Sequence, residues 1–399
     1  MEKHVVRILT LILSLSVFAV ASANTSLAAQ AQLQVDAAQD DGGAGSAGNR
    51  RSLKHLFERE TFGGNGRTCL TCHGRQTGTV SPEQARKRFA AHPSDPLFVH
   101  DGSDDGLGNG VTRMLEHATT LVEIPLPPNV RLVDDPTARS VTLRRGIPTT
   151  LNTPTLDPIL MLDGRGPDLE SQALGAIHAH FQHTEEPTEE DLRQLAEFQQ
   201  TARFFSSPAL KKFARGGPAP ELPPGDTESE KRGRLFFVDG PHERPFQKAG
   251  ACAACHSGPL LNESSKFFEP ILPAGTRFQS VGVSEFNAIG NPVRDFIFTN
   301  PDGSETLVSS PDPGRALITG VVQSPFFDSV NAFKIPSLWG IRRTAPYFHD
   351  NSAKTLEAVA AHYATFFAVI STPGGGGEPA LVLTEQDQAD IVAYMKLLD

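Results

Sequence analysis

The chain is poor in several features that define common classes of protein. Its 399 residues include only four cysteines, too few for a disulfide framework in a chain of this length. Lys and Arg number 36 against 46 Asp and Glu, and the net charge of -10 argues against a nucleic-acid partner. Beyond residues 8–21, no apolar run approaches the roughly 20 residues that span a bilayer. We therefore expect a soluble mature protein that binds no nucleic acid.

The first residues have the pattern of a secretory signal. Lys3 and Arg7 give a positively charged start, residues 8–21 an apolar core, and Ala21-Ser22-Ala23 a cleavage site of small residues. This pattern predicts a signal peptide over residues 1–23 and export to the periplasm. Residues 24–50 contain almost no large apolar side chains, so we expect a flexible lead-in there.

All four cysteines belong to two copies of one motif, CxxCH. The copies are Cys69-Leu70-Thr71-Cys72-His73 and Cys252-Ala253-Ala254-Cys255-His256. This spacing attaches c-type haem, because both thiols reach vinyl groups of the porphyrin while the next residue turns its imidazole onto the iron. The sequence therefore predicts two covalently bound haem c groups with His73 and His256 as proximal ligands. Bacterial attachment of haem c requires export, which agrees with the signal peptide.

Other uses of paired cysteines fit less well. A four-cysteine zinc ribbon would place its two CxxC pairs about 15 to 20 residues apart, whereas these pairs lie far apart along the chain. A thioredoxin-like redox pair has no use for the histidine that follows both pairs.

Helix signals precede both motifs. Leu53, Leu56 and Phe57 share one face of a predicted helix before the first motif, and Thr227 to Glu230 match a capping box that opens a helix before the second. Residues 214–226 are rich in Pro and Gly and predict a linker. The expected haem domains therefore span residues 51–213 and 227–399.

Three further helices and one hairpin are expected. The helices run from Asp168 to about His183, from Thr188 to Phe204 or Phe205, and from residue 383 to residue 398. Phe296 and Phe298 alternate with polar residues before an Asn-Pro-Asp-Gly turn, which predicts a small hairpin.

Several stretches outside the haem motifs resemble one known family. Residues 333–340 read Phe-Lys-Ile-Pro-Ser-Leu-Trp-Gly, residues 344–350 read Thr-Ala-Pro-Tyr-Phe-His-Asp, and Thr-Leu-Glu follows at 355–357. Pro148-Thr149 to Asn152 and Asp163-Gly164-Arg165 precede them in the same order. Together with both CxxCH motifs, this pattern resembles the bacterial di-haem cytochrome c peroxidase and MauG superfamily.

The resemblance implies a fold, cofactors and partners. The fold would be mainly α, with two cytochrome c-like haem domains, long loops and a little β-hairpin. A calcium ion would lie between the domains, held by Asn152, Thr344 and Pro346. Hydrogen peroxide would react at the N-terminal haem, and electrons would enter through the C-terminal haem from a small periplasmic donor, either a cytochrome c or a cupredoxin. The oligomeric state stays open, a homodimer included.

One departure from the family's peroxidases concerns the second iron. Those peroxidases usually place a methionine there, and counting from Thr355-Leu356-Glu357 the equivalent position is Tyr363, where MauG-like relatives also carry tyrosine. Helix phase independently puts Tyr363 on an apolar face with Leu356 and Val359 and turns His362 aside. A core tyrosine without a role at the iron remains the alternative.

A second departure concerns proton delivery. The acidic residue that assists peroxide cleavage in the family corresponds to Gln182, and glutamine cannot shuttle a proton as a carboxylate does. His180 and His183 are candidates to replace it, as are Glu185 and Glu186. The aromatic residue that often precedes Asp-Gly-Arg is Leu162 here, so Trp339 either takes its role between the haems or packs in a core.

Three functions follow as hypotheses. The first is an oxidoreductase of the cytochrome c peroxidase type, which reduces hydrogen peroxide at the iron opposite His73. The second is a MauG-like oxidase acting on a protein or organic substrate, which an anionic Tyr363 on the second iron would favour. The third is a di-haem electron-transfer cytochrome without peroxide chemistry.

Overall fold

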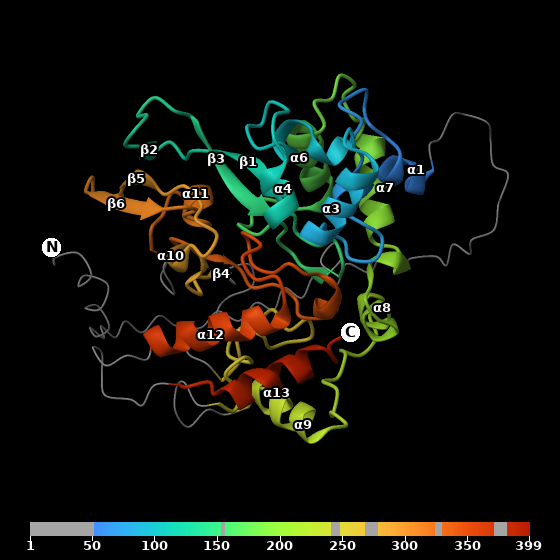
Figure 1. The fold of residues 1–399 in the computed structure, drawn as a ribbon, viewed down its shortest axis with the longest axis vertical. Helices are drawn as coiled ribbons and strands as arrows, with labels where there is room; N and C mark the ends of the chain where they lie inside the picture. The colour runs from blue at the N-terminus through green and yellow to red at the C-terminus, as the bar shows by residue number, and fades with distance from the viewer. Residues whose placement is uncertain (1–51, 153–155, 241–247, 268–277, 324–328, 371–380) are drawn as a thin grey trace, which may run out of the picture.

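The computed structural model describes residues 52–152, 156–240, 248–267, 278–323, 329–370 and 381–399. The predicted signal peptide and the whole of the predicted lead-in lie outside these residues. Helices dominate the described part, in agreement with the expected fold class, and Figure 1 shows them in two groups. One group contains α1, α3, α6 and α7, and the other contains α9, α12 and α13.

The helices are short. The α-helices are α1 Leu53–Glu58, α2 Cys69–Cys72, α3 Pro82–Ala91, α4 Thr112–His117, α6 Leu169–His180, α7 Glu189–Gln199, α8 Pro208–Ala214, α9 Glu228–Arg234, α10 Val283–Phe286, α11 Ala316–Thr319, α12 Leu356–Ile370 and α13 Glu385–Met395. Single 3-10 turns are η1 Pro96–Phe98, η2 His100–Gly102, η3 Ala202–Phe204, η4 Leu235–Phe237 and η5 Ile341–Arg343. None of the helices in the described residues is both long enough and apolar enough to cross a membrane.

The first helical group packs around a cluster of phenylalanines. Phe57 of α1 contacts Phe198 of α7 and Phe204 of η3, with ring centroids 5.3 and 5.4 Å apart. Capping residues start both helices: the Ser52 side chain caps α1, and Thr188, where a helix start was expected, forms a capping box with Asp191 at α7. This core supports the segment that leads into the first CxxCH motif.

Three of the predicted helices are shorter than expected, including the last, which ends at Met395 rather than at residue 398. The helix expected from Asp168 to about His183 ends at His180, because Phe181 caps it and Gln182 has a positive φ of 49° that a helix cannot continue. The helix expected to reach Phe204 or Phe205 ends at Gln199 and is followed by η3.

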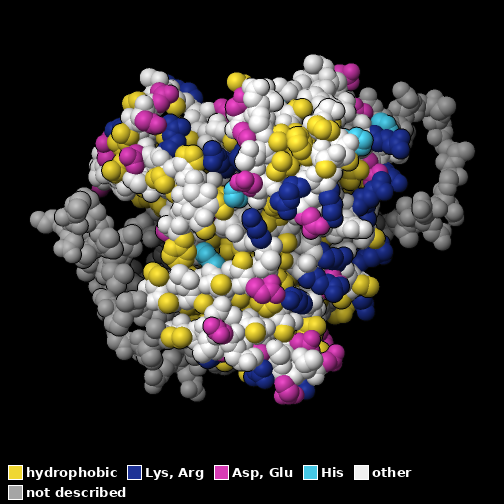
Figure 2. Space-filling model, in the orientation of Figure 1, with side chains coloured by type: hydrophobic (Ala, Val, Ile, Leu, Met, Phe, Trp, Pro, Cys, Tyr) yellow, Lys and Arg dark blue, Asp and Glu magenta, His cyan; other side chains and the backbone are white. Residues whose placement is uncertain are grey.

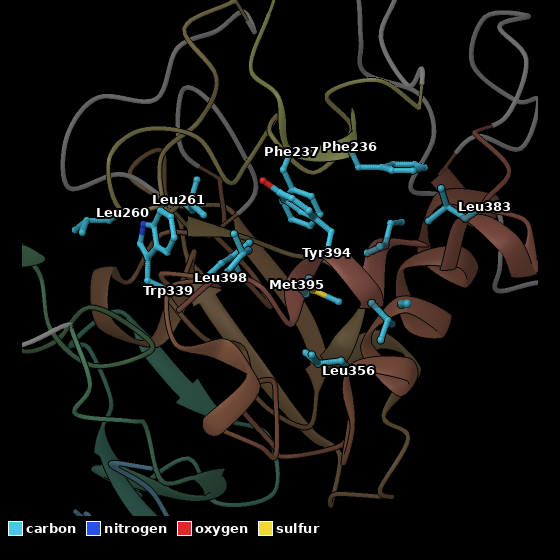
Figure 3. Packing of buried hydrophobic residues seen from close by; sticks show 14 of the residues in the cluster. Phe236, Phe237, Leu260, Leu261, Trp339, Leu356, Leu383, Tyr394, Met395 and Leu398 are labelled. Carbon is cyan, nitrogen blue, oxygen red and sulfur yellow. The ribbon is translucent and has the colours of Figure 1, made fainter. Parts of the chain in front are cut away.

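The second helical group forms the largest apolar core of the described residues. Figure 3 shows Tyr394 beside Phe237, and Trp339 beside Leu260, Leu261 and Leu398. Both helix starts predicted here are confirmed, with capping boxes at Thr227 before α9 and at Thr384 before α13.

Gly233 allows α9 and α13 to approach closely. A Cβ atom at this position would lie only 2.0 Å from the carbonyl oxygen of Asp390. The Asp390 side chain, on α13, accepts hydrogen bonds from Arg232 at 2.7 and 2.9 Å and from Ser229 at 2.6 Å, which holds the two helices together.

The strands are β1 Thr119–Pro125, β2 Val130–Leu132, β3 Ser140–Gly146, β4 Phe278–Gln279, β5 Arg294–Thr299, β6 Glu305–Ser310 and β7 Phe333–Lys334. The predicted hairpin is confirmed as β5 and β6, joined through a turn that places Gly303 at φ 82°. The antiparallel β1 and β3 pair was not predicted.

One sheet joins the two halves of the chain. It has the order β2-β5-β6, so a strand at residues 130–132 pairs with a strand at residues 294–299. A single apolar cluster beneath it takes Ile124 and Leu132 from the first half and Phe296 and Phe298 from the second. The two halves of the chain therefore share a β-rich core, and residues 217–225, in the predicted linker, contain no helix or strand.

Candidate haem centres

The first CxxCH motif lies on α2, a single helical turn. Thr68 caps this turn through a capping box with Thr71, so the backbone around both cysteines is fixed locally. Cys69 packs against the phenylalanine core of α1 and α7, whereas Cys72 packs against a neighbouring cluster that contains Phe98 and Met114. Both thiols are free, as are those of Cys252 and Cys255.

The histidines of the two motifs are held in the same way. The Nδ1 atom of His73 lies 2.9 Å from the carbonyl oxygen of Gly78, and that of His256 lies 2.8 Å from the carbonyl oxygen of Leu261, five residues downstream in each case. With the proton on Nδ1 donated to the carbonyl, Nε2 is the nitrogen that can ligate a metal. Two different sequences thus produce the same orientation of the candidate ligand.

The surroundings favour the ligating form of both imidazoles. Desolvation lowers the pKa of His73 and of His256, and the hydrogen bonds to Gly78 and Leu261 oppose it only in part. The carbonyl of Pro336 also lies near His256. A neutral imidazole with a defined Nε2 and two free thiols in an apolar setting fit the attachment of haem c at both motifs.

A buried polar chain lies beside the first motif. His180, at the end of α6, pairs through Nδ1 with the Asp101 carboxylate, and the same carboxylate is bound by Arg67. Arg67 and Asp101 are only 1% and 4% exposed. The Arg67 guanidinium also donates to the carbonyl oxygens of Pro96 at 2.8 Å and Val99 at 2.6 Å.

This chain fixes the His180 ring close to the segment before the first CxxCH motif, because Asn65 and Arg67 also donate to the His180 carbonyl. Burial alone would raise the pKa of Asp101, but the hydrogen bonds and charges of His180 and Arg67 outweigh it and hold the pKa below its usual value. Nε2 of His180 makes no hydrogen bond to any residue that the structure describes. Desolvation is the main cause that lowers the pKa of His73, and the charge of His180 adds to it.

The other predicted distal residues have different partners. The Gln182 side chain accepts a hydrogen bond from Asn65 at 3.3 Å, and Nε2 of His183 lies 3.1 Å from Glu186. The structure therefore brings His180, Gln182 and His183 close together, but only His180 has a buried partner.

Tyr363 faces the second haem motif. It lies on α12 among the apolar residues that also contact Cys252. Burial raises its pKa, and the nearby Cys255 and Cys252 thiols add to this effect. The hydroxyl groups of Tyr347 and Tyr394 donate to backbone carbonyls at 3.0 Å, whereas that of Tyr363 has no hydrogen-bond partner within the described ranges.

His362 and Trp339 both bond to the backbone. Nε2 of His362 lies 2.7 Å from the carbonyl oxygen of Val281, and the ring stands edge-on to that of Tyr363 with centroids 5.8 Å apart. The indole of Trp339 is 5% exposed and donates to Pro259 at 2.9 Å in the core of the second helical group.

Charged side chains are buried where the halves of the chain meet. Arg145 of β3 binds Asp312 through two hydrogen bonds of 2.6 and 2.8 Å and also pairs with Asp163. Arg165 donates to Asp163 at 2.7 Å. Asp312 comes from the second half, so this network connects the Asp-Gly-Arg segment before α6 to the loop after β6.

Of the predicted calcium residues, Asn152 contacts Ser206 and Trp339, and Ser206 in turn contacts the residue before Thr344. The side-chain oxygen of Asn152 accepts the Ser206 N–H at 2.7 Å, and its amide donates to the carbonyl of Trp339 at 2.8 Å. The carbonyl of Ser206 accepts from Arg343, directly before Thr344, at 2.7 Å. An amide oxygen has two lone pairs, so Asn152 retains one for a cation, and with the carbonyls of Thr344 and Pro346 it would offer the neutral oxygen ligands that Ca²⁺ accepts.

These sites define a c-type haem protein. No family model matches the chain. It is 29% identical over 169 residues to the cytochrome-c peroxidase IdrP1 of Denitromonas iodatirespirans, covering 38% of each protein. It is 26% identical over 227 residues to the cytochrome c551 peroxidase of Nitrosomonas europaea, covering 53% of this chain and 55% of that protein. The matches thus span less than two thirds of the length of these relatives.

Solved structures with a similar arrangement include a MauG-like protein associated with microbial copper homeostasis, with a TM-score of 0.46 and 20% identity over 87% of each chain. Another is the diheme peroxidase BthA from Burkholderia thailandensis, with a TM-score of 0.39 and 16% identity over 87% of this chain and 84% of that one. The two curated relatives agree with the resemblance of the chain's motifs to bacterial di-haem cytochrome c peroxidases and MauG-like proteins.

Sequence reasoning missed Arg67, Asp101 and the Arg145 network. Arg67 is separated from Cys69 only by Thr68. This closeness to the first CxxCH motif was the one feature of the sequence that could have marked Arg67 as part of the site. Asp101 opens an acidic turn that reads as a solvated loop, and nothing in its sequence context predicts burial.

Proposed function

We propose that the chain is a di-haem oxidoreductase that reduces hydrogen peroxide to water, H₂O₂ + 2 H⁺ + 2 e⁻ → 2 H₂O, at the first haem site. Electrons would reach this site through the second haem. The observation that carries the proposal is a difference between the two CxxCH sites. Their histidines, His73 and His256, are held by the same kind of hydrogen bond, but the residues near them differ. The first has a histidine oriented by a buried carboxylate, and the second has a tyrosine without a hydrogen-bond partner in the described residues.

Cys69, Cys72 and His73 would hold the first haem, which when bound supplies an iron for peroxide binding and one-electron chemistry. The chain's own contribution is proton delivery. Asp101 holds His180 through Nδ1, so that Nε2 is the atom that accepts a proton from one peroxide oxygen and returns it to the other. His180 thereby replaces the carboxylate that the family has at the position of Gln182.

Cys252, Cys255 and His256 would hold the second haem, and Tyr363 would be a further ligand of its iron. The burial of Tyr363 beside the thiols of Cys252 and Cys255 supports this role, as does the lack of another partner for its hydroxyl in the described residues. A tyrosinate lowers the potential of a haem relative to methionine, which suits storage of oxidising equivalents. Tyr363 therefore also favours a second candidate function, a MauG-like oxidase acting on a protein or organic substrate.

Replacing Tyr363 by phenylalanine tests the ligand. We expect the reduction potential of the second haem to rise on the order of 100 mV, because a phenolate no longer stabilises its ferric state. Spectropotentiometry of the holoprotein measures this. Tyr394→Phe is a matched control, since that hydroxyl donates to Pro223 in the same core. Equal potentials in wild type and Tyr363→Phe would leave Tyr363 as a packing residue.

The electron donor is proposed to be a small periplasmic cytochrome c or cupredoxin, consistent with the predicted signal peptide. Figure 2 shows Lys and Arg side chains gathered on the side of this face that carries α3 and α8, although the protein is acidic overall. Arg86, Lys87 and Lys212 are exposed residues of these two helices. A donor with an acidic docking surface would be complementary to this side.

A calcium ion at Asn152, Thr344 and Pro346 is part of the proposal. The ion would link Asn152 to the segment that carries Thr344 and Pro346. Ser206 already connects Asn152 to Arg343, the residue before Thr344. Neutral ligands alone make such a site weak, so its occupancy would depend on the calcium concentration.

The decisive experiment is peroxide-dependent oxidation of a reduced small cytochrome c by the purified holoprotein with its second haem reduced beforehand. We expect saturable turnover that requires peroxide. Negligible turnover, with peroxide still changing the haem spectrum, would favour the MauG-like oxidase. No spectral change would contradict both functions.

A further inference from the structure

We propose that His178, His183 and Glu186 form a binding site for a divalent transition-metal ion, separate from both haem sites. Nε2 of His178 lies 2.8 Å from one Glu186 oxygen, and Nε2 of His183 lies 3.1 Å from the other. The potential ligand atoms of the three residues all lie within 4.8 Å of one another. Two imidazoles and one carboxylate form a ligand set that suits Zn²⁺ and its neighbours in the first transition series.

The segment that carries these residues is held in place by the backbone before the first haem motif. The N–H groups of Thr184 and Glu185 both donate to the carbonyl of Phe62 at 3.0 Å, and the Thr184 hydroxyl donates to Gly63 at 3.0 Å. His178 is fixed independently by the last turn of α6. The backbone positions of the ligands are therefore set before any ion binds, which reduces the entropy cost of forming the site.

A simple surface ion pair does not account for this arrangement. An exposed ion pair contributes only roughly 0 to 1 kcal/mol to stability, so it gives little reason for a second imidazole to join the first. Here both imidazoles nevertheless converge on the one carboxylate of Glu186. The two rings are stacked, with centroids 4.7 Å apart and planes 8° apart. Since a metal must lie near the plane of each imidazole that ligates it, one ring must turn about its Cβ–Cγ bond on binding. His178 has room to do so because its side chain is 45% exposed.

The ion would have three protein ligands and at least one position left for water or an exogenous ligand. The cluster uses neither Asp101 nor Arg67, and its partners are distinct from those of His180. Metal binding can therefore be measured without reference to the haem reaction, and it does not depend on the proposed function.

The test is calorimetric titration of tag-free holoprotein with Zn²⁺, which is redox-inert and leaves the haems in one oxidation state. We expect one ion per chain with a micromolar or tighter dissociation constant, weakened at least tenfold in Glu186→Gln and in a His178→Gln/His183→Gln double variant. His55→Gln, which removes an exposed histidine from α1, is the matched control and should bind as wild type does.

Thermal unfolding of every variant without zinc checks that the fold is retained, and zinc should raise the unfolding temperature of wild type more than that of Glu186→Gln. Absence of a stoichiometric ion in wild type would overturn the proposal. Equal affinity in wild type and Glu186→Gln would also overturn it, because the ion would then be bound elsewhere.

Discussion

Replacing His180 by glutamine should slow the reaction of the reduced holoprotein with hydrogen peroxide by about 100- to 10,000-fold, the usual contribution of a positioned acid–base group. Glutamine retains a polar side chain of similar reach but cannot accept and return a proton. Stopped-flow spectra of the first haem after mixing with peroxide measure the rate directly. Steady-state oxidation of a reduced cytochrome c provides the second readout.

Two companion variants make this result specific. His92→Gln removes an exposed histidine from the same half of the chain and should leave the rate unchanged. Asp101→Asn should lower the rate while keeping His180 present, because the carboxylate that orients its Nδ1 is lost. A wild-type rate in His180→Gln would contradict the role. A faster rate together with a changed resting spectrum would instead identify His180 as an iron ligand that blocks peroxide.

Replacing Arg145 by methionine should lower the free energy of unfolding by about 3 to 5 kcal/mol, the cost of breaking a buried ion pair from one side. Arg145, Asp163 and Asp312 are each at most 2% exposed, so neither carboxylate could recover a full water shell. Burial would lower the pKa of Arg145, but the charges of Asp312 and Asp163 outweigh it and raise the pKa, as expected for a tightly paired cation.

Urea unfolding of the holoprotein, followed by circular dichroism, measures this change. Arg131→Met is the matched control: Arg131 pairs with Glu305 across the sheet that joins the halves, but both side chains are largely exposed. That variant should change stability by less than about 1 kcal/mol. A similarly small effect of Arg145→Met would show that water enters the junction and solvates the two aspartates.

The elements that sequence reasoning located correctly all have local signals. The helix starts at Thr188, Thr227 and Thr384 are confirmed, because each capping box is contained within four consecutive residues. The β5 and β6 hairpin is confirmed for the same reason, since its turn and its alternation are contiguous. The end of α6 was placed three residues too late, because the composition of His180 to His183 does not show that Gln182 takes a positive φ.

Elements that depend on distant partners were missed. The pairing of Val130 with Phe298 joins residues far apart in the sequence, and β2 alone is too short to give a recognisable pattern. The boundaries of the two haem domains remain a prediction, although the sheet that joins the halves shows that part of the core belongs to both.

The sequence by itself determined the chemistry that needs only neighbouring residues. Both CxxCH motifs carry their thiols and proximal imidazole within five residues, so the candidate haem ligands could be read without any knowledge of the fold. Tyr363 could also be placed on an apolar helix face from the phase of α12. Tertiary structure decided what surrounds these groups. In the sequence, Asp101 has the pattern of a solvated turn. It becomes a buried partner of His180 only because folding brings together two residues 79 positions apart and pairs Asp101 with the buried Arg67. A carboxylate takes its role from its burial and its partners, and both are properties of the folded chain.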